Sequence, residues 1–152
     1  MATEQEQDAL NGLLAWTLSL RDTDFIHQHV VDVWAAQHAD GNAKPIGTAF
    51  ALIGLYLHVE KDYTGKQVQR VHMHLGQPHG RGRGRKQWPR FPLPADRGHI
   101  TVIDVMASPE SERASAIDAW CRCVWECWRE SHEQVRQWAT SEGINARPSK
   151  RL

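Results

Sequence analysis

The sequence lacks a long hydrophobic run, a disulfide framework and a signal-like N-terminus. No apolar stretch approaches the roughly 20 residues that a membrane-spanning helix requires, and residues 1–8 are acidic and polar. Cysteine is scarce, and its three copies crowd into one expected helix with a spacing typical of neither disulfides nor a zinc site: Cys121, Cys123 and Cys127. We therefore expect a cytoplasmic protein in a reducing compartment, without membrane contact.

The common nucleotide and hydrolase motifs are also missing. The chain has no phosphate-binding glycine loop, no nucleophile elbow, no Rossmann fingerprint and no internal repeat. Its 152 residues and 41% hydrophobic content fit one globular domain over residues 1–152. The reaction class is therefore not indicated by any motif.

Acidic residues are absent from one long stretch, although the net charge of the chain is zero. Residues 64–95 carry seven basic and no acidic side chains, whereas residues 1–63 carry three basic and nine acidic ones. Within this stretch, residues 76–95 are expected to form a long basic loop. The loop would attract an anionic substrate or nucleic acid, and its short RGG-type segment beside Trp88 suggests these candidate contacts: Arg81, Arg83, Arg85, Lys86 and Arg90. A basic loop without a specific partner has the same composition.

Helical periodicity dominates the rest of the chain. Apolar residues recur at helical spacing in residues 5–20, 25–38, 46–60 and 66–75, and in a long segment from about 108 to 140. Residues 88–94 are expected to be extended and docked by aromatic side chains, and residues 100–105 favour a short helix over a strand. We expect an all-α protein, an irregular bundle of four to five helices, with residues 1–4 and 143–152 disordered.

Three histidines, one in each of three consecutive helices, are expected at one level of this bundle. Short turns join the three helices, so we treat them as antiparallel neighbours. The first turn then brings His29 level with His58, and the second brings His58 level with His72. Asp32 lies one turn from His29 on nearly the same face. The pattern predicts that these four side chains converge.

Three imidazoles and one carboxylate form a ligand set that zinc, iron, manganese or nickel accepts, with a position left for water or substrate. His27 competes with His29 from a neighbouring face of the same helix, and His132 lies near the apolar stripe of the last helix, so both are alternate ligands. The same groups also fit a hydrogen-bonded core layer without metal. The sequence does not choose between these interpretations.

Two further patterns near these histidines have two readings each. The small residues Gly47, Ala51 and Gly54 form a stripe that ends at His58, and they either let two helices approach closely or leave a groove. Cys123 and Cys127 form an i, i+4 pair, but no base is placed to activate either thiol, so a nucleophile is disfavoured.

Several segments resemble a family of small bacterial proteins known only as a domain of unknown function. The matching segments run from residue 25 to about 138: FIHQHVVDVWAAQ (25–37), KPIGTAFALIGLYLHVEK (44–61), GKQVQRVHMHL (65–75), WPRFPLP (88–94) and AIDAWCRCVWECW (116–128). The resemblance includes His27, His29, Asp32, His58 and His72, and it implies no activity. A looser likeness to DinB-type metal-binding helical bundles is one of fold only, because their characteristic histidine spacing is absent.

The leading hypothesis is a protein that holds a divalent metal with His29, His58, His72 and Asp32, and that acts as a metal-dependent enzyme on a small or anionic molecule. The alternative is a non-catalytic protein that binds nucleic acid or an acidic partner through residues 81–90. A third interpretation is a homodimer that pairs through exposed tryptophans such as Trp125.

Overall fold

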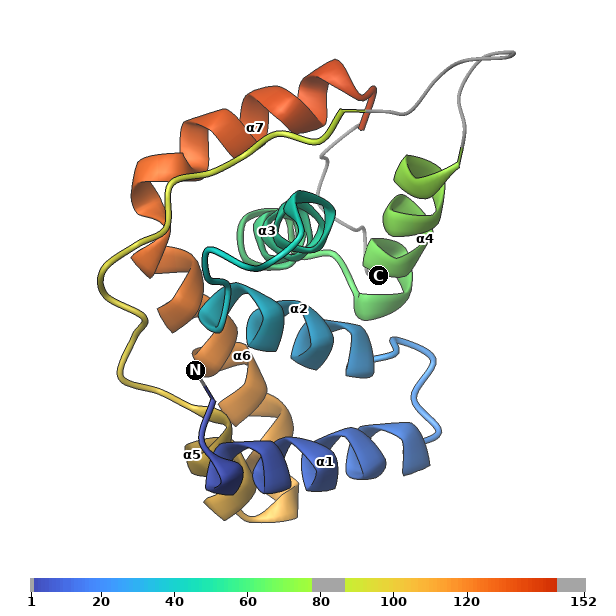
Figure 1. Cartoon of the computed structure of the whole chain (residues 1–152). Coiled ribbons are helices and arrows are strands. Elements are labelled where there is room, and N and C mark those ends of the chain that lie inside the picture. Colours follow the sequence, from blue (N-terminus) through green and yellow to red (C-terminus); the bar gives the residue numbers. More distant parts are fainter. Residues whose placement is uncertain (1, 78–86, 145–152) are drawn as a thin grey trace.

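The computed structural model describes residues 2–77 and 87–144. Within these ranges the chain forms seven α-helices, one short 3-10 helix and no strand, so the all-α prediction is confirmed and the count of four to five helices is wrong (Figure 1). The elements are α1 (Glu4–Ser19), α2 (His27–Gln37), α3 (Pro45–Lys61), α4 (Gly65–Gly76), α5 (Val102–Ala107), α6 (Glu110–Cys127), η1 (Arg129–Ser131) and α7 (His132–Ser141).

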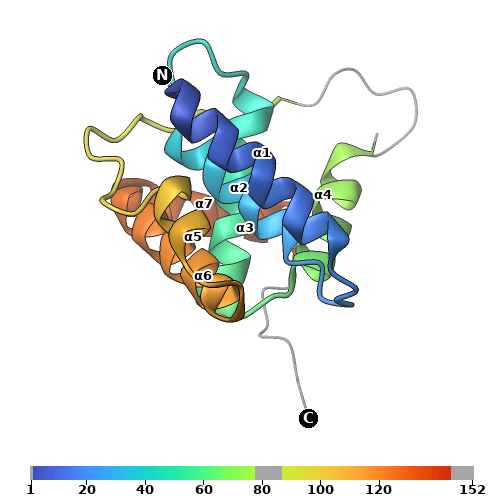
Figure 2. The ribbon, with the colours of Figure 1, turned by 90° about the horizontal axis from the view of Figure 1, so that it is seen from below.

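Helix α3 occupies the centre of the molecule. It packs against α2, α4, α6 and α7, while α1 and α5 pack together on the far side of α2. Figure 1 shows α3 along its axis with its neighbours around it, and Figure 2 shows α4 on one side of the molecule with α5, α6 and α7 on the other. The eight residues 49 and 51–57 are all buried, as expected for a helix that is apolar on every side.

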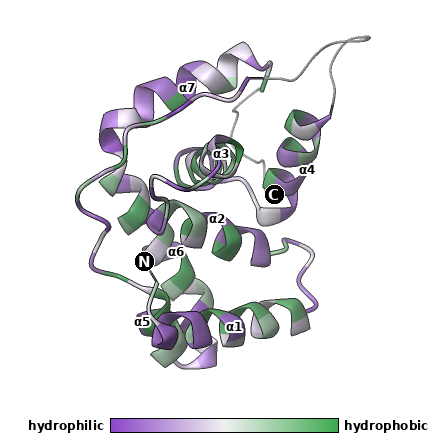
Figure 3. Cartoon of the chain, in the orientation of Figure 1, coloured by the Kyte–Doolittle hydropathy of each residue, from purple (hydrophilic) through white to green (hydrophobic). Residues whose placement is uncertain are grey.

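The outer helices begin at sequence signals that are local. Thr3, Thr64 and Thr101 each begin a helix with a capping box. The threonine hydroxyl accepts a hydrogen bond from the backbone N–H three residues later, or two residues later for Thr101. The side chain three residues later in turn accepts from the backbone N–H of the threonine. The box at Thr101 and Asp104 confirms a helix rather than a strand for α5. Figure 3 shows hydrophilic and hydrophobic residues alternating along α1 and α7, as expected for helices that cover a core.

The long C-terminal helix expected up to about residue 140 is divided in two. The carbonyl of Trp125 accepts from the backbone N–H of Trp128 at 3.0 Å and from His132 Nε2 at 2.8 Å, and the His132 ring stacks on the Trp125 indole at 3.8 Å. A continuous helix would give that carbonyl to the N–H of residue 129. The side chain of His132 thus stabilises a turn of 3-10 helix, and α7 leaves in a new direction. This contact between residues seven positions apart divides the expected last helix into α6 and α7.

The segment 87–101 runs without regular structure along α7 and α6 towards α5 (Figure 1). Trp88 packs edge-on against Phe50 and Trp138, with ring centroids 5.2 and 6.3 Å away, and Phe91 is buried. The prediction that aromatic side chains dock this segment is confirmed. Among the described residues, no helix is long and apolar enough to cross a membrane.

Candidate functional site: a histidine and carboxylate layer

His29 of α2 and His58 of α3 lie face to face. Their ring centroids are 3.7 Å apart with an angle of 23° between the planes. The prediction that His29 and His58 lie at the same level of the bundle is therefore confirmed. His29 is buried, and its backbone carbonyl accepts a hydrogen bond from the thiol of Cys121 on α6, with sulfur and oxygen 3.9 Å apart. The stacked pair therefore lies where α2, α3 and α6 meet.

His58 is oriented from both sides of its ring. Its Nδ1 lies 3.2 Å from the carbonyl oxygen of Tyr63, and because a carbonyl only accepts, Nδ1 carries the proton of this hydrogen bond. Its Nε2 lies 2.9 Å from Asp118 Oδ1 on α6. That distance fits an ion pair, but the angles do not fit a hydrogen bond, and Nε2 has no hydrogen-bond partner among the described residues. His58 Nε2 and Asp118 Oδ1 therefore lie close together without a hydrogen bond between them.

Asp118 is held in place by its own helix. Its second oxygen, Oδ2, accepts from Arg122 Nε at 3.0 Å, one turn further along α6. The side chain of Asp118 is 40% exposed and that of His58 is 14% exposed. The pair thus combines a buried nitrogen of His58 with an oxygen of the partly exposed Asp118 at the edge of the core.

His72 and Asp32 form a second pair, between α4 and α2. His72 Nε2 donates to the backbone carbonyl of Phe50 at 2.9 Å, and His72 Nδ1 accepts from Gln28 Nε2 at 3.3 Å. Gln28 Nε2 also donates to Asp32 Oδ1 at 3.1 Å, while His72 Nε2 and Asp32 Oδ1 are 4.0 Å apart. Both nitrogens of His72 are therefore used by hydrogen bonds. Burial lowers the pKa of His72, and its hydrogen bond to Phe50 opposes this only in part.

Asp32 is the most unusual group in this layer. It is 3% exposed, and burial raises the pKa of its carboxyl group well above the usual range, with the hydrogen bond from Gln28 opposing this. Its Oδ2 is buried and has no hydrogen-bond partner within the part of the chain that the structure describes. This oxygen faces Gly54 of α3, where an added Cβ would overlap it. Of the two readings of the small-residue stripe, the structure shows close approach of α2 and α3 at Gly54.

The four predicted ligands thus occupy one region as two pairs. Among the residues that the structure describes, no group of three or more His, Cys, Asp or Glu side chains is arranged to hold a metal ion. His72 meets Phe50, about two turns nearer the start of α3 than His58. In Figure 1 α3 is seen along its axis and α4 from the side, so these helices cross and do not run antiparallel as expected.

The alternate ligands face other parts of the molecule. His27 Nδ1 lies 2.8 Å from the hydroxyl oxygen of Thr17 on α1, and burial lowers the pKa of His27. His132 stacks on Trp125 and lies 3.9 Å from Glu60, which Arg136 contacts through two hydrogen bonds. Both histidines therefore serve contacts between helices.

Two further predictions concerned contacts with nucleic acid and with a second copy of the chain. Arg81, Arg83, Arg85 and Lys86 lie outside the described residues, so the nucleic-acid prediction stays a prediction, and of that set Arg90 is described and exposed. The proposal that Trp125 is an exposed dimer contact is wrong. Trp125 is 3% exposed, and its indole N–H donates to Glu60 at 2.9 Å.

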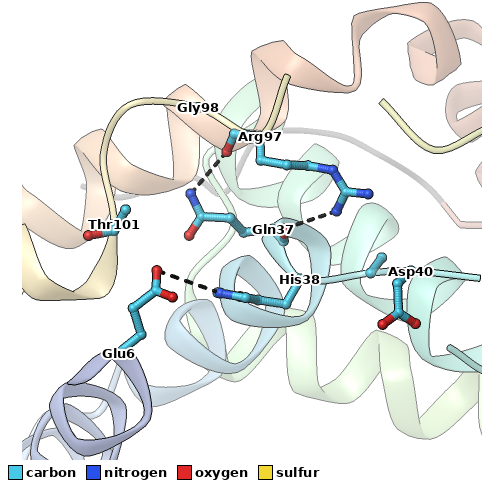
Figure 4. Close-up of a pocket in the computed structure, with 8 residues that line it drawn as sticks. Glu6, Gln37, His38, Asp40, Arg97, Gly98 and Thr101 are labelled. Carbon is cyan, nitrogen blue, oxygen red and sulfur yellow. Dashed lines mark hydrogen bonds and ion pairs between the residues drawn. The ribbon is translucent and has the colours of Figure 1, made fainter. Parts of the chain in front are cut away.

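A separate open cavity of about 440 Å³ lies at the end of α2, away from the histidine pairs. Its walls include Glu6, His38 and Arg97, and Figure 4 shows Glu6 reaching towards His38 while Gln37 and Arg97 exchange hydrogen bonds with each other's backbone. None of the predicted metal ligands contributes to it.

Comparison with known proteins identifies the family but no activity. The model of a family of unknown function, DUF5946, matches residues 6–129. The chain belongs to this family. No curated protein and no solved structure matches the chain at a significant level. The predicted membership of a domain of unknown function is confirmed, and any function has to be argued from the site.

Sequence reasoning missed three side chains that the fold brings to these groups. Asp118 lies 60 residues from His58, and Gln28 bridges the second pair. His99 lies beside Cys123, with Nδ1 and Sγ 3.7 Å apart. Gln28 lies one helical turn before Asp32, which was a usable signal. For Asp118 and His99 the sequence contains no local signal, because both contacts depend on how distant segments pack.

Proposed function

We propose that the protein binds one divalent transition metal ion at the edge of the histidine layer, with His58 as the anchoring ligand, Asp118 as its partner and His29 as the third donor. The observation that carries the proposal is the pair formed by His58 Nε2 and Asp118 Oδ1, which lie 2.9 Å apart without the geometry of a hydrogen bond. Two ligands of one tetrahedral zinc ion lie at a similar separation, about 3.3 Å, given metal–ligand bonds of about 2 Å.

The surroundings of this pair support the assignment. A metal-binding histidine usually donates its other ring N–H to a carbonyl or carboxylate, as His58 does to Tyr63, and a ligating carboxylate is usually hydrogen-bonded in turn, as Asp118 is by Arg122. His29 already stacks on the His58 ring, which makes it the candidate for the third donor.

His72 and Asp32 have a different part in the proposal. To bind an ion at Nε2, His72 would lose its hydrogen bond to Phe50, so we place it with Asp32 and Gln28 in a hydrogen-bonded layer that supports α2. Three protein donors leave one position for water, which is the arrangement of catalytic rather than structural zinc sites. A metal bound there lowers the pKa of that water, and this is the chemistry that a metal-dependent enzyme would use.

The decisive experiment measures metal content and thermal stability without a polyhistidine tag. Wild-type protein exposed to zinc, manganese, nickel or anaerobic iron(II) and then desalted should retain about one equivalent of one of these ions. Because the ion binds the native state, a hundredfold excess over Kd should stabilise it by about 2.7 kcal/mol, and a chelator should remove this effect. His58→Ala and Asp118→Asn should retain no ion and should melt identically with and without chelator.

Two controls make the result specific. His74→Ala changes an exposed histidine on α4 and should behave like wild type. His72→Ala removes the other predicted ligand, and it should bind the ion with unchanged stoichiometry. Loss of the ion in His72→Ala but not in Asp118→Asn would move the site to the pair of His72 and Asp32. A wild-type protein that takes up none of the four ions would leave the layer as a structural network and end the proposal.

A further inference from the structure

The three cysteines of α6 occupy three different environments. Cys121 is completely buried, and burial raises the pKa of its thiol well above the usual range, with the charge of Asp32 acting in the same direction. Cys127 ends α6, and burial, followed by the charge of Asp96, raises the pKa of its thiol. At both positions burial therefore favours the protonated thiol, which is a poorer nucleophile than the thiolate.

Cys123 differs because an imidazole faces it. Its Sγ lies 3.7 Å from Nδ1 of His99, within hydrogen-bond distance for sulfur, and its side chain is partly exposed. His99 itself is exposed on the segment 87–101. A thiol in contact with a histidine is the arrangement in which the imidazole takes the thiol proton and the sulfur becomes a nucleophile.

The backbone beside His99 is shaped for this contact. Gly98 has a φ of +94°, a conformation that side chains disfavour, and an added Cβ would lie 2.9 Å from Cys123 Sγ and 3.5 Å from Cys127 Sγ. Glycine therefore lets the segment close over the sulfur and bring His99 to it. The same contact leaves little room on that side of the sulfur, so a small reagent is favoured over a bulky one.

We propose that Cys123 is a nucleophilic thiol, with His99 as its base, and that it reacts with small hydroperoxides. The proton of the thiol moves to Nδ1 of His99, and the sulfur attacks the terminal oxygen of the peroxide. The S–O bond forms as the O–O bond breaks, and the imidazolium returns the proton to the departing oxygen. Cys123 is oxidised to a sulfenic acid, and the hydroperoxide is reduced to an alcohol or, for hydrogen peroxide, to water.

The size of the oxidant follows from the same geometry. Oxidation adds a single oxygen atom to the sulfur and so needs less room than the transfer of a larger group, and Gly98 already lies close to the sulfur on one side. The site is separate from the metal site proposed above and does not depend on it.

The test uses the folded, chelator-treated full chain with low concentrations of hydrogen peroxide. Sulfenic acid is trapped by a dimedone reagent, and each cysteine peptide is quantified by mass spectrometry over time. Cys123 should be labelled at least about tenfold faster than Cys121 and Cys127, because Cys123 has the adjacent base. Cys123→Ser should abolish the early labelling, and Cys127→Ser should leave it unchanged.

His99→Gln decides whether the imidazole matters. This exposed side chain can be replaced without disturbing the core, and an unchanged melting temperature would verify that the variant is folded. Its Cys123 should be labelled about tenfold more slowly, close to the rate of Cys127. Labelling of Cys127 or Cys121 before Cys123 in the wild type, or an unchanged rate at Cys123 in folded His99→Gln, would overturn the proposal.

Discussion

Asp32 carries a carboxyl group that the fold holds in the core, where its charged form is unfavourable. A carboxyl group buried in the core is stable only when it is hydrogen-bonded or protonated, and among the described residues only Oδ1 has a partner, Gln28. The raised pKa of Asp32 follows from this burial, which the single hydrogen bond does not offset. The protein therefore keeps this side chain as an acid over part of the pH range in which an exposed aspartate is ionised.

A dependence of stability on pH follows from this acid. The folded state keeps the Asp32 proton at pH values where the unfolded chain, with an ordinary pKa of 3.8, has lost it. The contribution of protonated Asp32 to the free energy of unfolding is therefore fully present below about pH 3.8. It is lost as the pH rises through the higher pKa of the folded state. Asp32→Asn cannot ionise and should escape this loss.

We expect the unfolding free energy of Asp32→Asn, relative to that of wild type, to increase between pH 4.5 and pH 7.5. The change is about 1.4 kcal/mol for each pH unit by which the pKa of Asp32 in the folded protein lies above 4.5, up to pH 7.5. Urea denaturation at both pH values, with a chelator present, measures it. An identical difference at the two pH values would show that Asp32 is ionised in the folded protein.

At the scale of the elements, the contact between α2 and α3 depends on one glycine. Gly54 lies against Asp32 Oδ2, whereas Gly47, on the same helix and two turns earlier, has no described atom within 4 Å of the position that an added Cβ would take. Both glycines weaken an isolated helix, because glycine has a low helix propensity. The structure therefore separates a glycine that is needed for packing from one that is not.

This pair of glycines gives a matched prediction. Gly54→Ala should destabilise the protein by about 1–3 kcal/mol or more, because the new methyl group overlaps a carboxyl oxygen that cannot move without breaking the layer. Gly47→Ala should stabilise it by up to about 1 kcal/mol through helix propensity. Chemical denaturation of the two variants measures both values. Equal effects of the two substitutions would contradict close packing of α2 on α3.

At the scale of the whole molecule, Gln37 connects the helical core to the irregular segment. Its side-chain N–H groups donate to the carbonyls of Arg97 and Ile100 at 2.9 and 2.8 Å, and its Oε1 accepts from the indole N–H of Trp120 at 2.9 Å. Arg97 returns a bond to the backbone carbonyl of Gln37. The end of α2, α6 and the wall of the open cavity in Figure 4 are thus joined through one buried amide.

Removing that amide should loosen the molecule as a whole. Gln37→Leu leaves the Trp120 N–H and two carbonyls without partners, and each buried polar group left unpaired costs about 1–3 kcal/mol, so a loss of at least about 2 kcal/mol is expected. Gln134→Ala is the control, because its side chain also donates to a carbonyl of this segment, that of Arg90, but in an exposed position. It should change stability by less than about 0.5 kcal/mol.

Amide hydrogen exchange adds the location of the effect. In Gln37→Leu, protection should fall first in residues 96–101 and at the end of α2, before the rest of the core opens. If Gln37→Leu is as stable as Gln134→Ala, Gln37 does not hold the segment in place.

The amino-acid sequence by itself determined the helical class, the central position of residues 46–60, the capped start of α5 and the contact of His29 with His58. These features follow from short-range signals: apolar periodicity, threonine caps and turns that set how two consecutive helices pair. The tertiary structure decided the rest. The crossing of α4 over α3 placed His72 against Phe50. Asp118 and His99 reached their partners in the same way, because contacts between distant segments depend on crossing angles that no local pattern encodes.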